Sequence, residues 1–118
     1  MEIQVSKLRE ALKLLEPVVP RKSALEVIKY VFLGDGKAVA TDLEIAVSVD
    51  LPEASEPALV PVKTAIAFLD GVPGHRMAKL TAGKKNVVVV VGDTEARWDT
   101  HDVEDFPPVE HKDFEHDA

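Results

Sequence analysis

Two carboxylates, Asp42 and Glu44, stand two residues apart inside the stretch AVATDLEIAVSVDL, residues Ala38–Leu51. On a continuous strand, side chains two positions apart share one face, so this pair could bind a cation. However, no histidine and no third carboxylate stands close by in the sequence. We therefore predict that the pair belongs to a turn between two apolar strands and does not hold a metal.

Other residues with chemical potential also lack the partners that chemistry requires. No serine lies in a Gly-x-Ser-x-Gly elbow, and neither Gly34-Asp35-Gly36-Lys37 nor Gly83-Lys84-Lys85 has the spacing of a phosphate-binding loop. Both glycine segments are instead typical of hairpin turns. The chain contains no cysteine, which removes thiol catalysis and zinc–thiolate sites. We predict no catalytic residue, no metal site and no cofactor, and hence a protein that is not an enzyme.

The charge of the chain is concentrated at its C-terminal end. The 118 residues carry a net charge of −7, yet residues 1–98 hold 13 acidic and 13 basic side chains. Residues 99–118 hold eight acidic side chains, one basic side chain and three of the four histidines. We therefore expect one domain, residues 1–108, and an acidic, His-containing tail, residues 109–118, where His111 and His116 form no dedicated metal site.

The protein is expected to be cytoplasmic and without a membrane partner. No apolar run approaches the ~20 residues that a membrane-spanning helix needs. No signal peptide is visible at Met1, and the absence of cysteine suits a reducing compartment.

The hydrophobic pattern predicts the same order of elements twice. In the first half we expect a strand, then a helix capped by Ser6 with an apolar stripe, then three strands, at residues 2–5, 7–16, 27–33, 37–41 and 44–51. In the second half we expect the same order at residues 58–60, 61–70, 76–82, 87–91 and 95–100, with Pro61 opening the helix. The predicted fold class is α+β, with duplicated β-α-β-β-β halves and both helices packed on one face of an antiparallel sheet.

Four segments together resemble the N-terminal domain of the bacterial sliding clamp, the beta subunit of DNA polymerase III. In chain order they are VPRKSALEVI (Val19–Ile28), ATDLEIAV (Ala40–Val47), VPVKTAIAFLDGVP (Val60–Pro73) and EDFP (Glu104–Pro107). The resemblance covers residues 1–108 without large gaps. It implies a clamp-like domain whose helices line a hole and whose sheets form the outer wall.

This resemblance also implies a function. Sliding clamps are closed rings around duplex DNA that confer processivity on the replicative polymerase, and they contact phosphates rather than bases. The implied partners are duplex DNA, other clamp domains or protomers in an oligomeric ring, and the polymerase and clamp loader through domains absent here. A clamp protomer has three such domains in tandem, so we expect this chain to be either a fragment or a free-standing single-domain relative.

The resemblance assigns site residues with different directness. Lys22 matches a basic position that touches DNA in the family, Arg21 adjoins it, and Lys63 matches a basic residue of the second helix. Three further cations of the first helix fit by face only: Lys7, Arg9 and Lys13. Two residues of the last strand match apolar positions at the subunit boundary of the ring: Ala96 and Trp98.

Two more expectations concern individual acidic residues. In the Asp-Leu-Glu turn, the resemblance implies that Leu43 points inward and that the carboxylates hold the turn by bonding backbone N–H groups. Asp70 falls where the family usually has a basic residue, which opposes DNA binding and the helix dipole. Together with the acidic tail, Asp70 keeps open an alternative function: a clamp-fold interaction module that has lost DNA handling.

Overall fold

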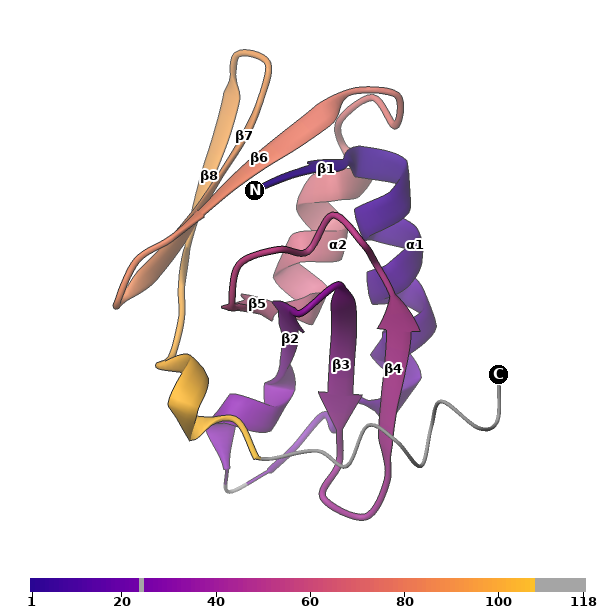
Figure 1. The fold of residues 1–118 in the computed structure, drawn as a ribbon, viewed down its shortest axis with the longest axis vertical. Coiled ribbons are helices and arrows are strands. Elements are labelled where there is room, and N and C mark those ends of the chain that lie inside the picture. Colours follow the sequence, from indigo (N-terminus) through magenta and orange to yellow (C-terminus); the bar gives the residue numbers. More distant parts are fainter. Residues whose placement is uncertain (24, 108–118) are drawn as a thin grey trace.

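The computed structural model describes residues 1–23 and 25–107, and it contains two helices and two separate four-stranded antiparallel sheets (Figure 1). The predicted tail, with His111 and His116, lies outside the described residues. The first sheet has the order β1-β6-β7-β8, with bounds Glu2–Gln4, Met77–Ala82, Asn86–Val91 and Thr94–Asp99. The second has the order β4-β3-β2-β5, with bounds Ala46–Asp50, Lys37–Thr41, Tyr30–Gly34 and Ala58–Pro61.

The two halves of the chain exchange their first strands. Strand β1 pairs with β6 of the second half, with Ile3 opposite Ala78, and β5 pairs with β2 of the first half, with Val60 opposite Val31. The predicted α+β class and the repeated strand-helix-three-strand order are confirmed. The single sheet of the prediction is two sheets, because each half supplies three strands to its own sheet and one strand to the other.

Helices α1 (Val5–Leu15) and α2 (Val62–Asp70) pack side by side, behind the second sheet in Figure 1. Each begins directly after a strand, without a side-chain cap. The prediction that Ser6 caps the first helix is therefore wrong: Gln4 occupies the N-cap position, and the amide of Ser6 donates to the carbonyl of Gly74 at 3.0 Å. The helix can begin this early because Val5 is already part of its buried face.

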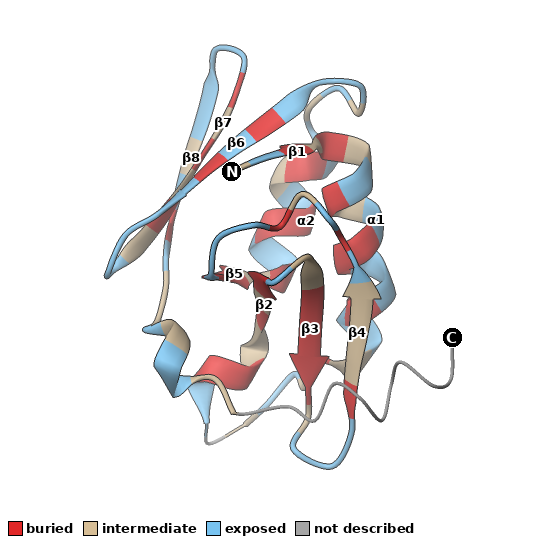
Figure 2. Ribbon diagram, viewed as in Figure 1, coloured by how far each residue is buried: buried red, intermediate tan, exposed pale blue. Residues whose placement is uncertain are grey.

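One continuous core lies between the helices and the two sheets (Figure 2). The predicted apolar stripe of α1 is its buried face, and α2 contributes a similar stripe. The buried helical residues are Val5, Leu8, Ala11, Leu12 and Leu15 from α1, and Val62, Ala65, Ile66 and Leu69 from α2. Alternating valines of β7 and residues of β2 and β3 complete this core.

A second, smaller cluster lies under the segment that follows β8. It contains the buried residues Val27, Ile28 and Leu59, and Phe106 packs against it with its ring centroid 5.9 Å from that of Phe32. Residues Glu26–Lys29 form a turn of 3₁₀ helix, which corrects the predicted strand start at residue 27. Val27 and Ile28 are both buried, and two consecutive buried residues do not fit the alternation of a half-exposed strand.

The Asp42 turn has the predicted capping carboxylate but not the predicted leucine. Oδ1 of Asp42 accepts hydrogen bonds from the amides of Glu44 at 2.9 Å and Ile45 at 2.8 Å. These two bonds hold the pKa of the Asp42 carboxyl below its usual value. Leu43 points outward, with 59 % of its surface exposed, and it adopts a left-handed backbone conformation at φ 81°. The expectation that Leu43 turns inward is wrong.

Candidate nucleic-acid interface

Three cations of α1 were assigned to DNA contact only because they share a face of the helix, and each of them has an acidic partner. Nζ of Lys7 lies 2.8 Å from the carboxylate of Glu53, in the linker between β4 and β5. Nζ of Lys13 lies 3.1 Å from Oδ1 of Asp70, and a guanidinium nitrogen of Arg9 lies 3.9 Å from the same oxygen. All three predicted cations are therefore present on the surface of α1, and each lies beside an acidic residue of the same molecule.

Asp70 is the residue that joins the two helices electrostatically. It is the last residue of α2, where a carboxylate opposes the helix dipole. Lys13 and Arg9 offset this unfavourable position from the neighbouring helix. The sequence singled out Asp70 as a departure, but it could not reveal these partners, because they stand far away in the chain.

The cations that the resemblance assigned most directly to DNA contact differ from those of α1 in their acidic neighbours. Among the residues that the structure describes, no acidic group lies within ion-pair distance of Arg21, Lys22 or Lys63. Arg21 and Lys63 line the same groove, between the segment after α1 and the start of α2. Arg21 is thus brought together with Lys63, and Lys22 is exposed beside it.

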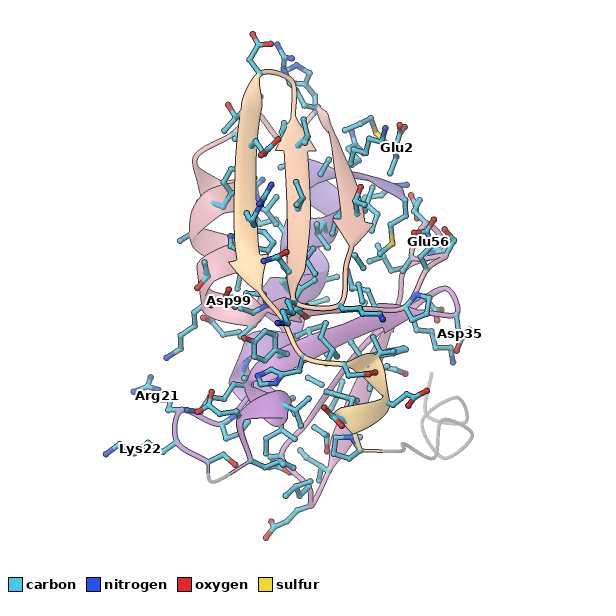
Figure 3. The ribbon with its side chains drawn as sticks, turned by 90° about the vertical axis from the view of Figure 1, so that its left-hand side faces the viewer. Glu2, Arg21, Lys22, Asp35, Glu56 and Asp99 are labelled. Carbon is cyan, nitrogen blue, oxygen red and sulfur yellow. The ribbon has the colours of Figure 1, made fainter. Side chains whose placement is uncertain are left out.

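The labelled charges are unevenly distributed over the molecule. In Figure 3, Arg21 and Lys22 project toward the side on which α2 lies, and Asp99 lies on that side too. The other labelled acids, Glu2, Asp35 and Glu56, lie on the opposite side. Lys63 is the second residue of α2, where the positive end of the helix dipole adds to its charge. The side near the helices therefore carries the unpaired cations Arg21, Lys22 and Lys63 together with acidic residues such as Asp70.

The groove that holds Arg21 and Lys63 contains two residues that sequence reasoning missed, Lys29 and Tyr30. Lys29 pairs with Glu26 at 2.9 Å, and this contact lowers the pKa of the Glu26 carboxyl. The Tyr30 hydroxyl donates to the backbone carbonyl of Asp99 at 3.2 Å, and partial burial raises the pKa of Tyr30. The only signal in the sequence was a basic residue next to an aromatic one, Lys29-Tyr30, which is too common to predict a groove.

The predicted boundary residues lie on the inner face of β8, the end strand of its sheet. Trp98 is 7 % exposed, and its ring meets that of Phe68 edge-on with centroids 5.8 Å apart. Ala96 is half-buried against the same core. The boundary role of Ala96 and Trp98 stays a prediction, in which their side chains support the strand while its backbone edge is available to a neighbour.

Little else among residues 1–23 and 25–107 suggests chemistry. No three residues of the His, Asp and Glu types gather there as a metal site would require. The carboxylate of Asp42 is engaged by two amides, as described above, and Glu44 is exposed beside it. Neither helix in this part of the chain is long and apolar enough to cross a membrane.

Comparison with solved structures identifies this architecture. No protein-family model and no curated protein sequence matches the chain. Among solved structures, the DNA polymerase III subunit beta of Pseudomonas aeruginosa matches 93 % of the chain, with a TM-score of 0.78 and 27 % sequence identity. The match covers 32 % of the Pseudomonas chain.

Two more distant bacterial proteins show the same fold. The sliding clamp of Bartonella birtlesii matches 93 % of the chain and 32 % of its own, with a TM-score of 0.79 and 20 % identity. A putative beta subunit of Eubacterium rectale matches 92 % of the chain and 32 % of its own, with a TM-score of 0.80 and 12 % identity. The chain thus has the structure of one domain of the bacterial DNA polymerase III beta sliding clamp, and it spans about a third of the length of the clamps that it matches.

Proposed function

We propose that this chain is a non-enzymatic sliding-clamp domain that contributes to the encirclement of duplex DNA and to polymerase processivity. The observation that carries the proposal is the match of nearly the whole chain to one domain of a clamp, at 27 % identity. The adjacent α1 and α2 helices and the unpaired Arg21, Lys22 and Lys63 supply a surface of the right charge for the role.

The proposed grip on DNA is electrostatic and independent of sequence. Lysine and arginine side chains contact phosphates, and such contacts fix a protein on the duplex without reading bases. Arg21 and Lys22 lie outside the helices and strands, and Lys63 lies on the first turn of α2. A few unpaired cations favour sliding, because a densely basic surface would hold the duplex in place.

Encirclement requires further domains, because one domain cannot surround a duplex. Each sheet has two edge strands, β1 and β8 in the first sheet and β4 and β5 in the second, and an edge strand offers unpaired backbone groups to a neighbour. We propose that other clamp domains join at these edges, head to tail, so that the contacts close into a ring. The polymerase and the clamp loader would then bind through domains other than this one.

A salt titration of binding to a 30-base-pair duplex tests the proposal. The logarithm of the affinity should fall linearly with the logarithm of the salt concentration, by about 0.9 for each phosphate that is neutralised. Two duplexes of unrelated sequence should bind equally. Absence of binding at the lowest salt concentration would contradict the proposed DNA contact, and a clear preference for one sequence would contradict a phosphate-directed grip.

The pairing of Lys7, Arg9 and Lys13 with acids favours a second candidate, an interaction module of clamp fold that no longer handles DNA. In that case the helical side would not bind duplex at any salt concentration, while the edge strands would still bind other clamp domains. Light scattering of the chain alone, and of the chain mixed with a bacterial sliding clamp, measures the assembly without DNA. Assembly together with absent DNA binding would support this candidate.

A further inference from the structure

Two cations on α1 and the acid at the end of α2 form a compact cluster in which one carboxylate serves both cations. Its members are Arg9, Lys13 and Asp70, and Oδ1 of Asp70 faces both cations, at 3.9 Å from Arg9 and 3.1 Å from Lys13. The side chain of Arg9 is 30 % exposed, while those of Lys13 and Asp70 are about half exposed. The cluster therefore lies at the surface, within reach of a large anion.

The geometry points to a latent phosphate-binding patch, Arg9 and Lys13, that Asp70 masks. This inference deepens the proposed function and rests on it for the identity of the natural ligand. A phosphate that approaches either cation meets the repulsion of the Asp70 carboxylate and must compete with it for the same N–H donors. The masked patch would contribute little to the grip, so the contact with DNA would be concentrated at Arg21, Lys22 and Lys63.

The helix that carries the two cations is held in place by packing and does not depend on Asp70. Arg9 and Lys13 stand four residues apart on one face of α1, next to a buried stripe that anchors the helix. The side chain of Arg9 also lies over Gly74, in the loop after α2. Removal of the carboxylate should therefore expose two positioned cations without disturbing the fold.

The decisive variant is Asp70→Asn, which keeps the size of the side chain and removes its charge. Asp93→Asn is the matched control, because Asp93 is an exposed acid in the turn between β7 and β8 and has no ion pair among the described residues. Both variants change the net charge by one. A third protein combines Asp70→Asn with Arg9→Gln and Lys13→Gln, and circular dichroism confirms that each variant is folded.

Two probes separate this inference from the proposed function. Elution from immobilised heparin, a generic polyanion, reports exposed cations whatever the natural ligand is. For duplex DNA, Asp70→Asn should steepen the salt slope by about 0.9 to 1.8, which corresponds to one or two additional phosphate contacts. On heparin it should elute at a higher salt concentration than wild type and Asp93→Asn, and the combined variant should show neither increase.

Each outcome decides the inference. A shift on heparin without duplex binding would support the mask and contradict the proposed function. Duplex binding by wild type, with identical slopes and elution for Asp70→Asn and Asp93→Asn, would support the proposed function and overturn the mask. An increase that persists after Arg9 and Lys13 are removed would also overturn it, because the increase would then arise from residues other than these two cations.

Discussion

Helices α1 and α2 occupy equivalent positions in the two halves and pack into the same core, but their exposed surfaces differ. α1 is amphipathic, and its three cations have acidic partners. α2 is largely apolar, and its single cation, Lys63, has no acidic partner among the described residues. We therefore expect the capacity of each helix for an anion to follow the number of its basic residues that lack an acidic partner, and not their total number.

The largest expected effect concerns what the two helices share. Leu12 of α1 and Leu69 of α2 are fully buried, so Leu12→Ala and Leu69→Ala should each lower the free energy of unfolding by roughly 2–5 kcal/mol. Urea unfolding followed by circular dichroism measures both. Leu14→Ala is the control: Leu14 is 60 % exposed, and its loss should change stability by no more than about 0.5 kcal/mol. If only one of the two substitutions lowered the free energy of unfolding this much, the two helices would not contribute equally to stability.

The second effect concerns the difference between cations without acidic partners and cations with them. Replacement of Arg21, Lys22 and Lys63 by alanine should reduce the salt slope of duplex binding by about 0.9 for each phosphate that is no longer neutralised. Replacement of Lys7, Arg9 and Lys13 removes the same number of charges but should change the slope less, because these cations are already paired. Equal reductions in the two triple variants would contradict the distinction between paired and unpaired cations.

A smaller effect is expected at the two turns of the second sheet. The β2–β3 turn uses Gly34 and Gly36 at positive φ, whereas the β3–β4 turn places Leu43 at φ 81°. A leucine pays a steric penalty there that glycine avoids, so Leu43→Gly should raise the free energy of unfolding by roughly 0.5–1 kcal/mol. Chemical denaturation measures the increase, and Val47→Gly, within strand β4, is the control that should destabilise.

The smallest effect concerns the charge of Asp42. The pKa of its carboxyl is lowered in the folded state, so its ionised form stabilises the fold above the unfolded pKa of about 3.9. That contribution disappears as the pH falls through the lowered pKa. Asp42→Ala should therefore unfold at a lower urea concentration than wild type at pH 7, and the difference should shrink at pH 2. If the difference did not vary with pH, the charge of the Asp42 carboxylate would not be the source of the stabilisation.

Local features of this fold were predictable from the sequence because their causes are local. The stripe of Leu8, Leu12 and Leu15 has the period of a helix, and Gly34-Asp35-Gly36 supplies the positive φ angles of a tight turn. Pro61 was predicted one position too far into the helix: it ends β5 and is the N-cap residue of α2, which begins at Val62. The Asp42 turn was half predicted: the capping carboxylate follows from residue type, but the direction of Leu43 depends on the path of the whole turn.

Features that depend on distant residues were not predictable. Nothing near Lys13 indicates that it meets Asp70, because the contact requires α1 and α2 to lie side by side. Likewise, the pairing of β1 with β6 cannot be read from hydrophobic alternation, which reports the face of a strand and not its neighbour. The DNA-binding assignments came from the resemblance, and the structure divides them into paired and unpaired cations, which the resemblance did not do.

The exchange of first strands has a consequence for how the chain acquires its structure. A fragment that ends at residue 55 would contain β1 without β6 and β2 without β5. The complementary fragment would contain β6 without β1 and β5 without β2. Neither fragment has a complete sheet to nucleate on, so we expect each to remain unfolded alone and both to fold together when mixed. The repeated halves therefore behave as one cooperative unit, and complementation between them is the direct signature of that interdependence.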